Sequence, residues 1–189
     1  KILDILKDNQ VKAAFFVTTH YINSNKDLIK RMVDEGHLVC NHSTNHPYMT
    51  KLSEEQIVEE LNKTGNKICE LTKKKPILFR PPYGDYNDKL IRICMENGYY
   101  VIQWDVDSLD WKELGIQPVV DRVTRNVNNG SIVLFHNNAK YVSEYLPIVI
   151  EKLQSEGYEI VPISELIYKD NFYIDNTGRQ HKKETNENN

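Results

Sequence analysis

Cysteine is scarce in this sequence: the 189 residues include three, and no two of them have CxxC spacing. An odd number without that spacing argues against a disulfide framework and against a zinc site built from thiolates. We predict instead that Cys40, Cys69 and Cys94 are small residues of the core.

Long apolar runs and an excess of charge of one sign are absent too. The longest apolar runs, AAFFV and SIVLFH, are far too short to cross a bilayer, and no signal peptide is recognisable at the first residue. The net charge of −3 gives no general attraction to nucleic acid or to anionic membranes. We therefore expect no membrane span and no nucleic-acid partner.

What is present is the composition of an ordinary globular domain, with 40% hydrophobic and 27% charged residues in 22.1 kDa. This length is sufficient to bury a core without covalent staples. We place the domain at residues 1–168. The polar tail, 169–189, is expected to be disordered from about Gln180.

Short apolar segments alternate regularly with helical patterns along the chain. Six segments are typical of buried strands: residues 11–19, 37–41, 77–80, 99–106, 131–136 and 159–163. The helix expected at 53–72 opens with the capping-box sequence SEEQ. Strands interleaved with helices predict an α/β fold with a parallel sheet, either open and doubly wound or closed as a (β/α) barrel.

Polar groups follow directly on four of these strands. They are the histidines His42 and His46, the segments 80–83 and 107–111, and His136. Because the carboxyl ends of parallel strands share one face, these groups are expected on the face where α/β proteins build their active sites.

The segment HSTNH places His42 and His46 four residues apart. If the segment makes one helical turn, both imidazoles reach one cation, and a site of this kind leaves coordination positions for water and substrate. Spacing alone favours a solvated or capping polar loop, since two such histidines are more often not ligands and catalytic zinc usually has three protein ligands.

The segment FRPPYGDY is stiffened by two prolines. Arg80 can direct a permanent charge at a carboxylate, and the backbone N–H of Tyr83 is the first free donor after the prolines, able to stabilise an oxyanion. A rigid surface turn with an ordinary ion-paired arginine is the alternative.

The segment WDVDSLDW sets three acidic residues between Trp104 and Trp111. Flat rings beside carboxylates suit a sugar-binding cleft, although a solvated acidic loop has the same composition. His136 ends an apolar strand and is either a satisfied core histidine or a general acid whose other nitrogen is held by a carboxylate.

Taken in order, these motifs resemble those of the polysaccharide deacetylases of the NodB-homology type, carbohydrate esterase family 4. The family pattern has H-S/T-x-x-H, R-P-P-Y, D-x-x-D-W and L-x-H segments, which match residues 42–46, 80–83, 107–111 and 134–136. The resemblance extends over about residues 1–168. It implies an irregular (β/α)7-type barrel and the metal-dependent removal of N-acetyl groups from an amino-sugar polymer.

The resemblance also implies roles in metal binding and proton transfer. His42 and His46 would bind a divalent metal, most often zinc, with cobalt or another divalent ion possible. His136 would protonate the leaving amine and Asp110 would orient it, while Arg80 would orient the catalytic base.

Further roles implied by the resemblance concern the substrate. The Tyr83 backbone N–H would stabilise the oxyanion, and Trp111 and Leu134 would enclose the acetyl methyl group. Tyr83 and Asp107 are further predicted substrate contacts. The implied partner is a polysaccharide of peptidoglycan or chitin type, bound by a monomer that is extracellular or associated with the cell wall.

One family motif has no match. The T-F-D-D-G segment of the first barrel strand, which supplies the base and a third metal ligand, is absent, and no Asp-Asp pair occurs in the sequence. The opening residues 2–6 already have helical spacing, so we expect the first strand to be missing ahead of Lys1.

Two alternatives to N-deacetylation follow. Without the two aspartates, the domain could be a non-catalytic carbohydrate-binding relic of the same fold, with Trp104, Trp111 and Tyr83 as its sugar platform. An O-deacetylase of a xylan-like polymer is the other, since the same oxyanion chemistry serves esters.

Overall fold

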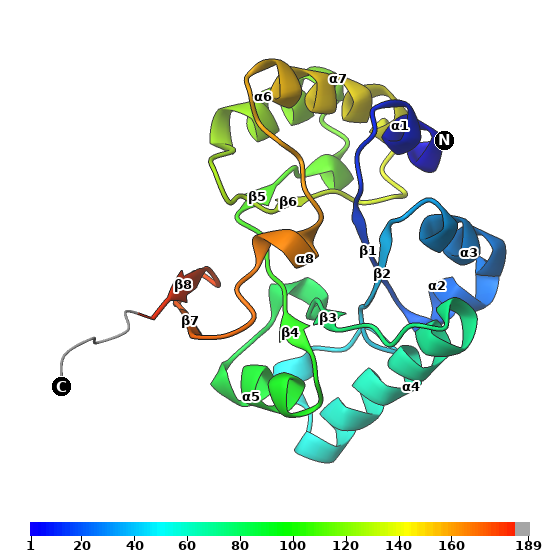
Figure 1. The fold of residues 1–189 in the computed structure, drawn as a ribbon, viewed down its shortest axis with the longest axis vertical. Helices are drawn as coiled ribbons and strands as arrows, with labels where there is room; N and C mark the ends of the chain where they lie inside the picture. Colours follow the sequence, from blue (N-terminus) through cyan, green and yellow to red (C-terminus); the bar gives the residue numbers. More distant parts are fainter. Residues whose placement is uncertain (184–189) are drawn as a thin grey trace. The chain divides into compact units, whose positions relative to one another are not determined.

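The computed structural model describes residues 1–183 and divides into two compact units (Figure 1). One unit is formed by residues 12–103. The other combines residues 1–11 with the chain from residue 104 onward. Both contain parallel strands and helices, so the expected α/β class with parallel pairing is confirmed.

The unit 12–103 is built on a parallel sheet of order β1-β2-β3-β4 (Figure 1). Its strands are β1 (Ala14–Val17), β2 (Leu38–Asn41), β3 (Leu78–Phe79) and β4 (Tyr100–Val101). Because all of them run the same way, the loops after β2 and β3 leave from the same edge of the sheet. These are the loops that carry the histidine pair and the Pro-Pro segment.

The helices of this unit are α2 (Thr19–Ser24), α3 (Lys26–Asp34), α4 (Glu54–Thr72) and α5 (Asp88–Glu96), with short 3-10 turns η1 (Met49–Lys51) and η2 (Pro82–Gly84). The capping box predicted for α4 is present between Ser53 and Gln56. Apolar residues on one side of α4, among them Ile57 and Leu61, are fully buried in the core with Phe79 of β3.

Gly65 lies where α4 passes close to the sheet. A Cβ atom at this position would come within 2.2 Å of the Tyr99 hydroxyl oxygen. Tyr99 is only 2% exposed, contacts the ring of Phe79, and accepts a hydrogen bond from Asn41 Nδ2 at 3.1 Å. Glycine is therefore required here by the close approach of a side chain that cannot easily move.

We predict that Gly65→Ala lowers the free energy of unfolding by about 1–3 kcal/mol, because the clash with Tyr99 outweighs the roughly 1 kcal/mol gained in helix propensity. Urea unfolding measures the change. The matched background is Tyr99→Phe, which removes the hydroxyl and should make Gly65→Ala nearly neutral. An equal cost in both backgrounds would contradict this account.

The second unit contains α1 (Ile2–Asp8), β5 (Val106–Asp107), η3 (Asp110–Lys112), α6 (Ile116–Asn126), β6 (Val133–Leu134), α7 (Val142–Ser155) and α8 (Ile163–Leu166). β5 and β6 pair in parallel, with Val106 opposite Val133. α7 packs against both α6 and α1. The carboxyl ends of β5 and β6 lead into the acidic segment and into His136.

Two predicted strands differ from the structure. The segment 99–106 is not one strand: β4 ends at Val101 and β5 begins at Val106, and they belong to different sheets. The segment 159–163 forms no strand, since Pro162 lacks an N–H and is the N-cap of α8.

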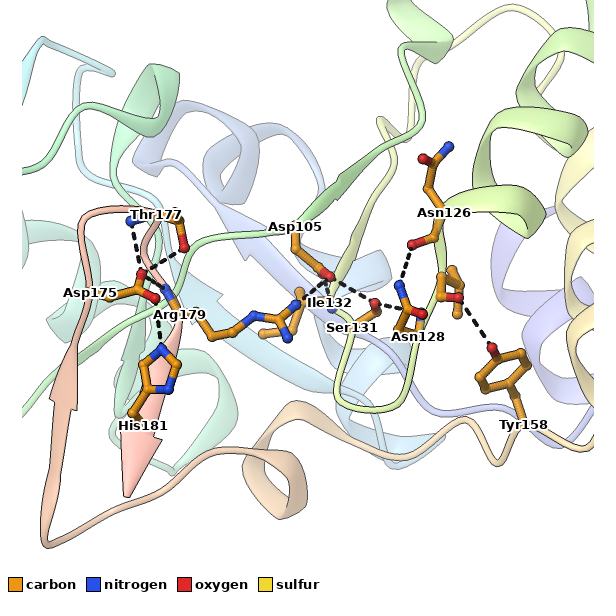
Figure 2. Close-up of polar contacts among 11 residues, drawn as sticks. Asp105, Asn126, Asn128, Ser131, Ile132, Tyr158, Asp175, Thr177, Arg179 and His181 are labelled. Atoms are coloured by element: carbon orange, nitrogen blue, oxygen red, sulfur yellow. Dashed lines mark hydrogen bonds and ion pairs between the residues drawn. The ribbon is translucent and has the colours of Figure 1, made fainter. Parts of the chain in front are cut away.

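The tail is ordered further than predicted. β7 (Phe172–Ile174) and β8 (Gln180–Lys182) form an antiparallel hairpin, so the disorder expected from Gln180 is wrong as far as residue 183. Asp175 accepts hydrogen bonds from Thr177 and His181 inside the hairpin, and Arg179 pairs with Asp105 at 2.9 Å (Figure 2). These bonds, within the hairpin and to Asp105, explain the order. The rest of that predicted segment, 184–189, lies outside the described residues.

Within residues 1–183, none of the helices has the length and apolar character needed to cross a membrane.

Candidate active site

His42 begins the loop after β2, and its ring contacts that of His46. The ring centroids are 4.8 Å apart at an interplanar angle of 75°. His42 Nδ1 lies 2.7 Å from the carbonyl oxygen of Arg80. Because a carbonyl only accepts, Nδ1 carries the hydrogen, and the lone pair of a neutral His42 is on Nε2. This is the arrangement in which histidine binds a metal.

The loop between the two histidines is held in an unusual backbone conformation. Ser43 and His46 have φ values of 70° and 57°, a left-handed region that costs a non-glycine residue of order 1–3 kcal/mol. Asn41 Oδ1 accepts the Ser43 N–H at 2.9 Å, and Ser43 Oγ accepts the His46 N–H at 3.0 Å. These bonds from buried side chains offset the strain and hold both imidazoles on one short loop.

The chemistry of the pair fits part of a metal site. Burial lowers the pKa of His46, which favours the neutral imidazole that binds cations. In residues 1–183, however, no cluster of three or more His, Cys, Asp or Glu side chains is arranged to hold a metal. His42 and His46 therefore fit as two ligands of a divalent cation, with the remaining positions filled by other groups.

Arg80 is 8% exposed and stacks its guanidinium over the ring of Phe16, 4.2 Å from the centroid. Burial lowers the pKa of Arg80 to about 10, so it still carries its charge at neutral pH. Its carbonyl is the partner of His42, a role that the sequence did not indicate.

Tyr83 is a residue of η2 with φ of 61°, and its side chain is 59% exposed. Its ring contacts that of His46 edge-on at 4.6 Å and stacks on Tyr48 at 4.3 Å. Asp85 accepts two hydrogen bonds from Thr50 and thereby connects the loops after β2 and β3. The Tyr83 ring thus lies beside that of His46.

In the other unit, His136 is paired with Asp110. His136 Nδ1 lies 2.7 Å from Asp110 Oδ1, and the His136 backbone N–H donates to Oδ2 at 2.8 Å. Tyr145 donates its hydroxyl to the same Oδ2 at 2.6 Å. The carboxylate is fully buried, whereas the His136 side chain is 38% exposed.

These contacts decide the charge of Asp110. Burial by itself raises the pKa of Asp110, but the hydrogen bonds from His136 and Tyr145 outweigh it and leave this pKa below its ordinary value. An ionised Asp110 can only accept, so His136 Nδ1 carries a hydrogen and Nε2 is the atom left to exchange a proton. The same environment raises the pKa of Tyr145.

The other predicted substrate residues of this unit lie within three positions of Asp110 or His136 in the chain. Trp111 follows Asp110 in η3 and is 57% exposed, and Leu134 on β6 accepts the Ser108 N–H through its carbonyl at 3.2 Å. Asp107 Oδ1 accepts the Leu109 N–H at 2.9 Å, so this carboxylate also shapes the turn that presents Asp110.

The predicted residues thus fall into two groups. The unit 12–103 brings together His42, His46, Arg80 and Tyr83, and the other unit brings together Asp107, Asp110, Trp111, Leu134 and His136. Sequence reasoning missed Tyr145, which reaches Asp110 from the first turn of α7, and Glu60 of α4, which binds the histidine loop. Both lie on helices inside regular patterns, where no local motif marks them.

Comparison with known proteins agrees with the motifs. The family described as polysaccharide deacetylase matches residues 1–102. The chain is 39% identical over 165 residues to the peptidoglycan-N-acetylglucosamine deacetylase PgdA of Listeria monocytogenes, covering 87% of this chain and 35% of PgdA. It is 33% identical over 172 residues to the peptidoglycan-N-acetylglucosamine deacetylase of Bacillus cereus, covering 88% of this chain and 80% of that protein.

Among solved structures, wild-type BA3943 of Bacillus anthracis, a CE4 family pseudoenzyme, superposes with a TM-score of 0.83 at 37% identity. The match covers 87% of this chain and 58% of that one. A mutant of BA3943 is described as having restored enzymatic activity.

The chain belongs to the polysaccharide deacetylase family. It spans 66% of a 30.6 kDa Geobacillus stearothermophilus relative that is 36% identical, and 35% of PgdA.

Proposed function

We propose that this protein is a metal-dependent hydrolase that removes N-acetyl groups from an amino-sugar polymer, with peptidoglycan as the first candidate substrate. The observation that carries the proposal is the hydrogen-bonded pair formed by the buried Asp110 carboxylate and the half-exposed His136 imidazole. Three hydrogen bonds fix the carboxylate, and the one to Nδ1 orients the imidazole for proton transfer through Nε2. A protein that only stacks sugar rings has no need of such a pair.

His42 and His46 would hold the divalent cation, zinc or a similar ion. A cation bound there supplies a Lewis acid for the acetamide carbonyl and an activated water. The chain fixes the tautomer of His42 through the Arg80 carbonyl and keeps His46 neutral by burial. Buried Arg80 contributes a permanent positive charge beside this loop, suited to orienting a carboxylate base.

Hydrolysis adds water to the acetyl carbon, breaks the C–N bond and releases acetate and an amine. The proton that the attacking water gives up would pass to a carboxylate base oriented by Arg80. His136 delivers a proton from Nε2 to the amine nitrogen as that bond breaks, and Asp110 stabilises the imidazolium form. The Tyr83 N–H donates to the developing oxyanion. Trp111 and Leu134 enclose the acetyl methyl group, and Asp107 accepts from a sugar hydroxyl.

The substrate class is supported by the relatives, whose names specify peptidoglycan N-acetylglucosamine or N-acetylmuramic acid deacetylation. A wall polymer as substrate requires an extracellular or wall-associated enzyme. We propose that it acts as a monomer.

A second candidate is a carbohydrate-binding protein without catalysis. It is favoured by the two-histidine donor set in residues 1–183 and by the pseudoenzyme BA3943 among similar structures. Retention of the Asp110–His136 pair, with its supporting Tyr145, weighs against it.

The test is acetate release from an N-acetylglucosamine oligomer and from peptidoglycan, with added zinc or cobalt and a chelated control. Metal-dependent release is the expected result, and an acetylated xylan oligomer run in parallel separates amide from ester hydrolysis. Binding of the oligomer without acetate release, whichever metal is added, would favour the second candidate.

A further inference from the structure

We propose that Glu60 of α4 is a positioning residue for the histidine loop, setting the affinity of His42 and His46 for their metal. The proposal rests on the metal site assigned under the proposed function. Glu60 is not one of the motif residues, and it contacts neither imidazole. It acts through two of the three residues between them, Thr44 and Asn45.

The Glu60 carboxylate accepts hydrogen bonds from consecutive backbone groups of the loop. Oε2 lies 2.8 Å from the Thr44 nitrogen and 2.9 Å from the Asn45 nitrogen, and Oε1 accepts from Asn45 Nδ2 at 2.6 Å. Two successive backbone N–H groups can point at one anion only when the backbone turns sharply between them. Ser43, directly before these two residues, is in the left-handed region.

A second contact from α4 fixes the same stretch. Thr44 Oγ1 donates to the Glu60 carbonyl at 3.0 Å and lies 3.1 Å from Thr64 Oγ1, which in turn lies 2.8 Å from Thr19 Oγ1. α4 therefore contacts the loop at two points one helical turn apart. The loop has no regular secondary structure, so these bonds and those of Asn41 determine where His42 and His46 lie.

Removing the carboxylate should widen the range of positions open to the two histidines. Residues that orient metal ligands typically change affinity by roughly 10- to 100-fold when mutated, which sets the expected size of the effect. Glu60→Gln is the conservative variant, because its amide oxygen can still accept the two backbone N–H groups if the Asn45 amide turns over. It should recover much of the affinity that Glu60→Ala loses.

The neighbouring Glu59 gives a matched control. It lies one residue earlier on α4, is 59% exposed, and pairs with Lys63 rather than with the loop. Glu59→Ala removes the same group from the same helix and should leave metal affinity within about twofold of the unmodified chain.

The experiment titrates the full chain and the three variants with Zn²⁺ by calorimetry and with Co²⁺ by visible absorption, and records the melting temperature of each metal-free protein. We expect Glu60→Ala to weaken metal binding roughly 10- to 100-fold and to alter the Co²⁺ spectrum. The affinity of Glu60→Gln should lie between those of Glu60→Ala and the unmodified chain. All metal-free forms should have the same melting temperature.

Two results separate the failure of this inference from the failure of the proposed function. If the unmodified chain binds neither ion, the metal site itself is wrong. If it binds, but Glu60→Ala binds equally well or loses no more affinity than Glu59→Ala, the positioning role is overturned. A loss of affinity that merely follows a lower melting temperature in both Glu60 variants would also overturn it.

Discussion

Deacetylation by the His136→Ala variant is expected to be slower in kcat by roughly 10²- to 10⁴-fold, the contribution of a positioned general acid, while metal content stays unchanged. Metal content should stay unchanged because His136 is held by Asp110, whereas His42 is held by the Arg80 carbonyl. Acetate release and metal analysis on the same preparation measure both quantities.

His20→Ala is the control for His136→Ala, since His20 is an exposed histidine on α2 outside both residue groups. It should retain full activity. Asp110→Asn should reproduce most of the loss seen with His136→Ala, because the amide replaces an acceptor oxygen by a donor facing His136 or Tyr145. If His136→Ala also emptied the metal site, its assignment as a proton donor would be wrong.

His46→Ala should give the opposite combination, with metal content and activity falling together. With two histidines as ligands, removal of one is expected to weaken Zn²⁺ binding by more than about 100-fold. This loss is larger than the one expected for a residue that only orients a ligand. Equilibrium dialysis against Zn²⁺, followed by acetate release at saturating metal, measures the two losses.

The same His20→Ala protein serves as the control for His46→Ala. His42→Ala should behave like His46→Ala, since the two rings adjoin. A His46→Ala protein that retained both metal and activity would show that the site lies elsewhere. Retained metal without activity would instead assign His46 to substrate contact through its neighbour Tyr83.

The sequence was sufficient for α4 and for most of the parallel strands, because apolar periodicity and the capping box of α4 are local signals. It was insufficient where the pairing of strands decides which residues form a strand and to which sheet that strand belongs. Residues 99–106 are apolar enough for one strand, yet β4 and β5 belong to different sheets. Order after Gln180 depends on bonds made by Asp175 and Arg179, which no apolar pattern records.

For the candidate site, the motif residues were predictable and their supports were not. His42 and His136 stand at strand ends, where spacing and chemistry identify them. Tyr145 and Glu60 lie 35 and 16 residues from the partners they bind, so only folding brings them there. The Arg80 carbonyl is a main-chain atom that every residue has, and no sequence pattern could have selected it.

That carbonyl has a consequence for how such a domain can change over time. A contact made by the main chain survives any replacement of the side chain, so a substitution at Arg80 can remove the guanidinium and still leave His42 in its ligand form. Under the proposed function, a substitution at Arg80 would thus impair catalysis without removing the His42 metal ligand. A descendant that had lost catalysis in this way could regain it without rebuilding the metal site.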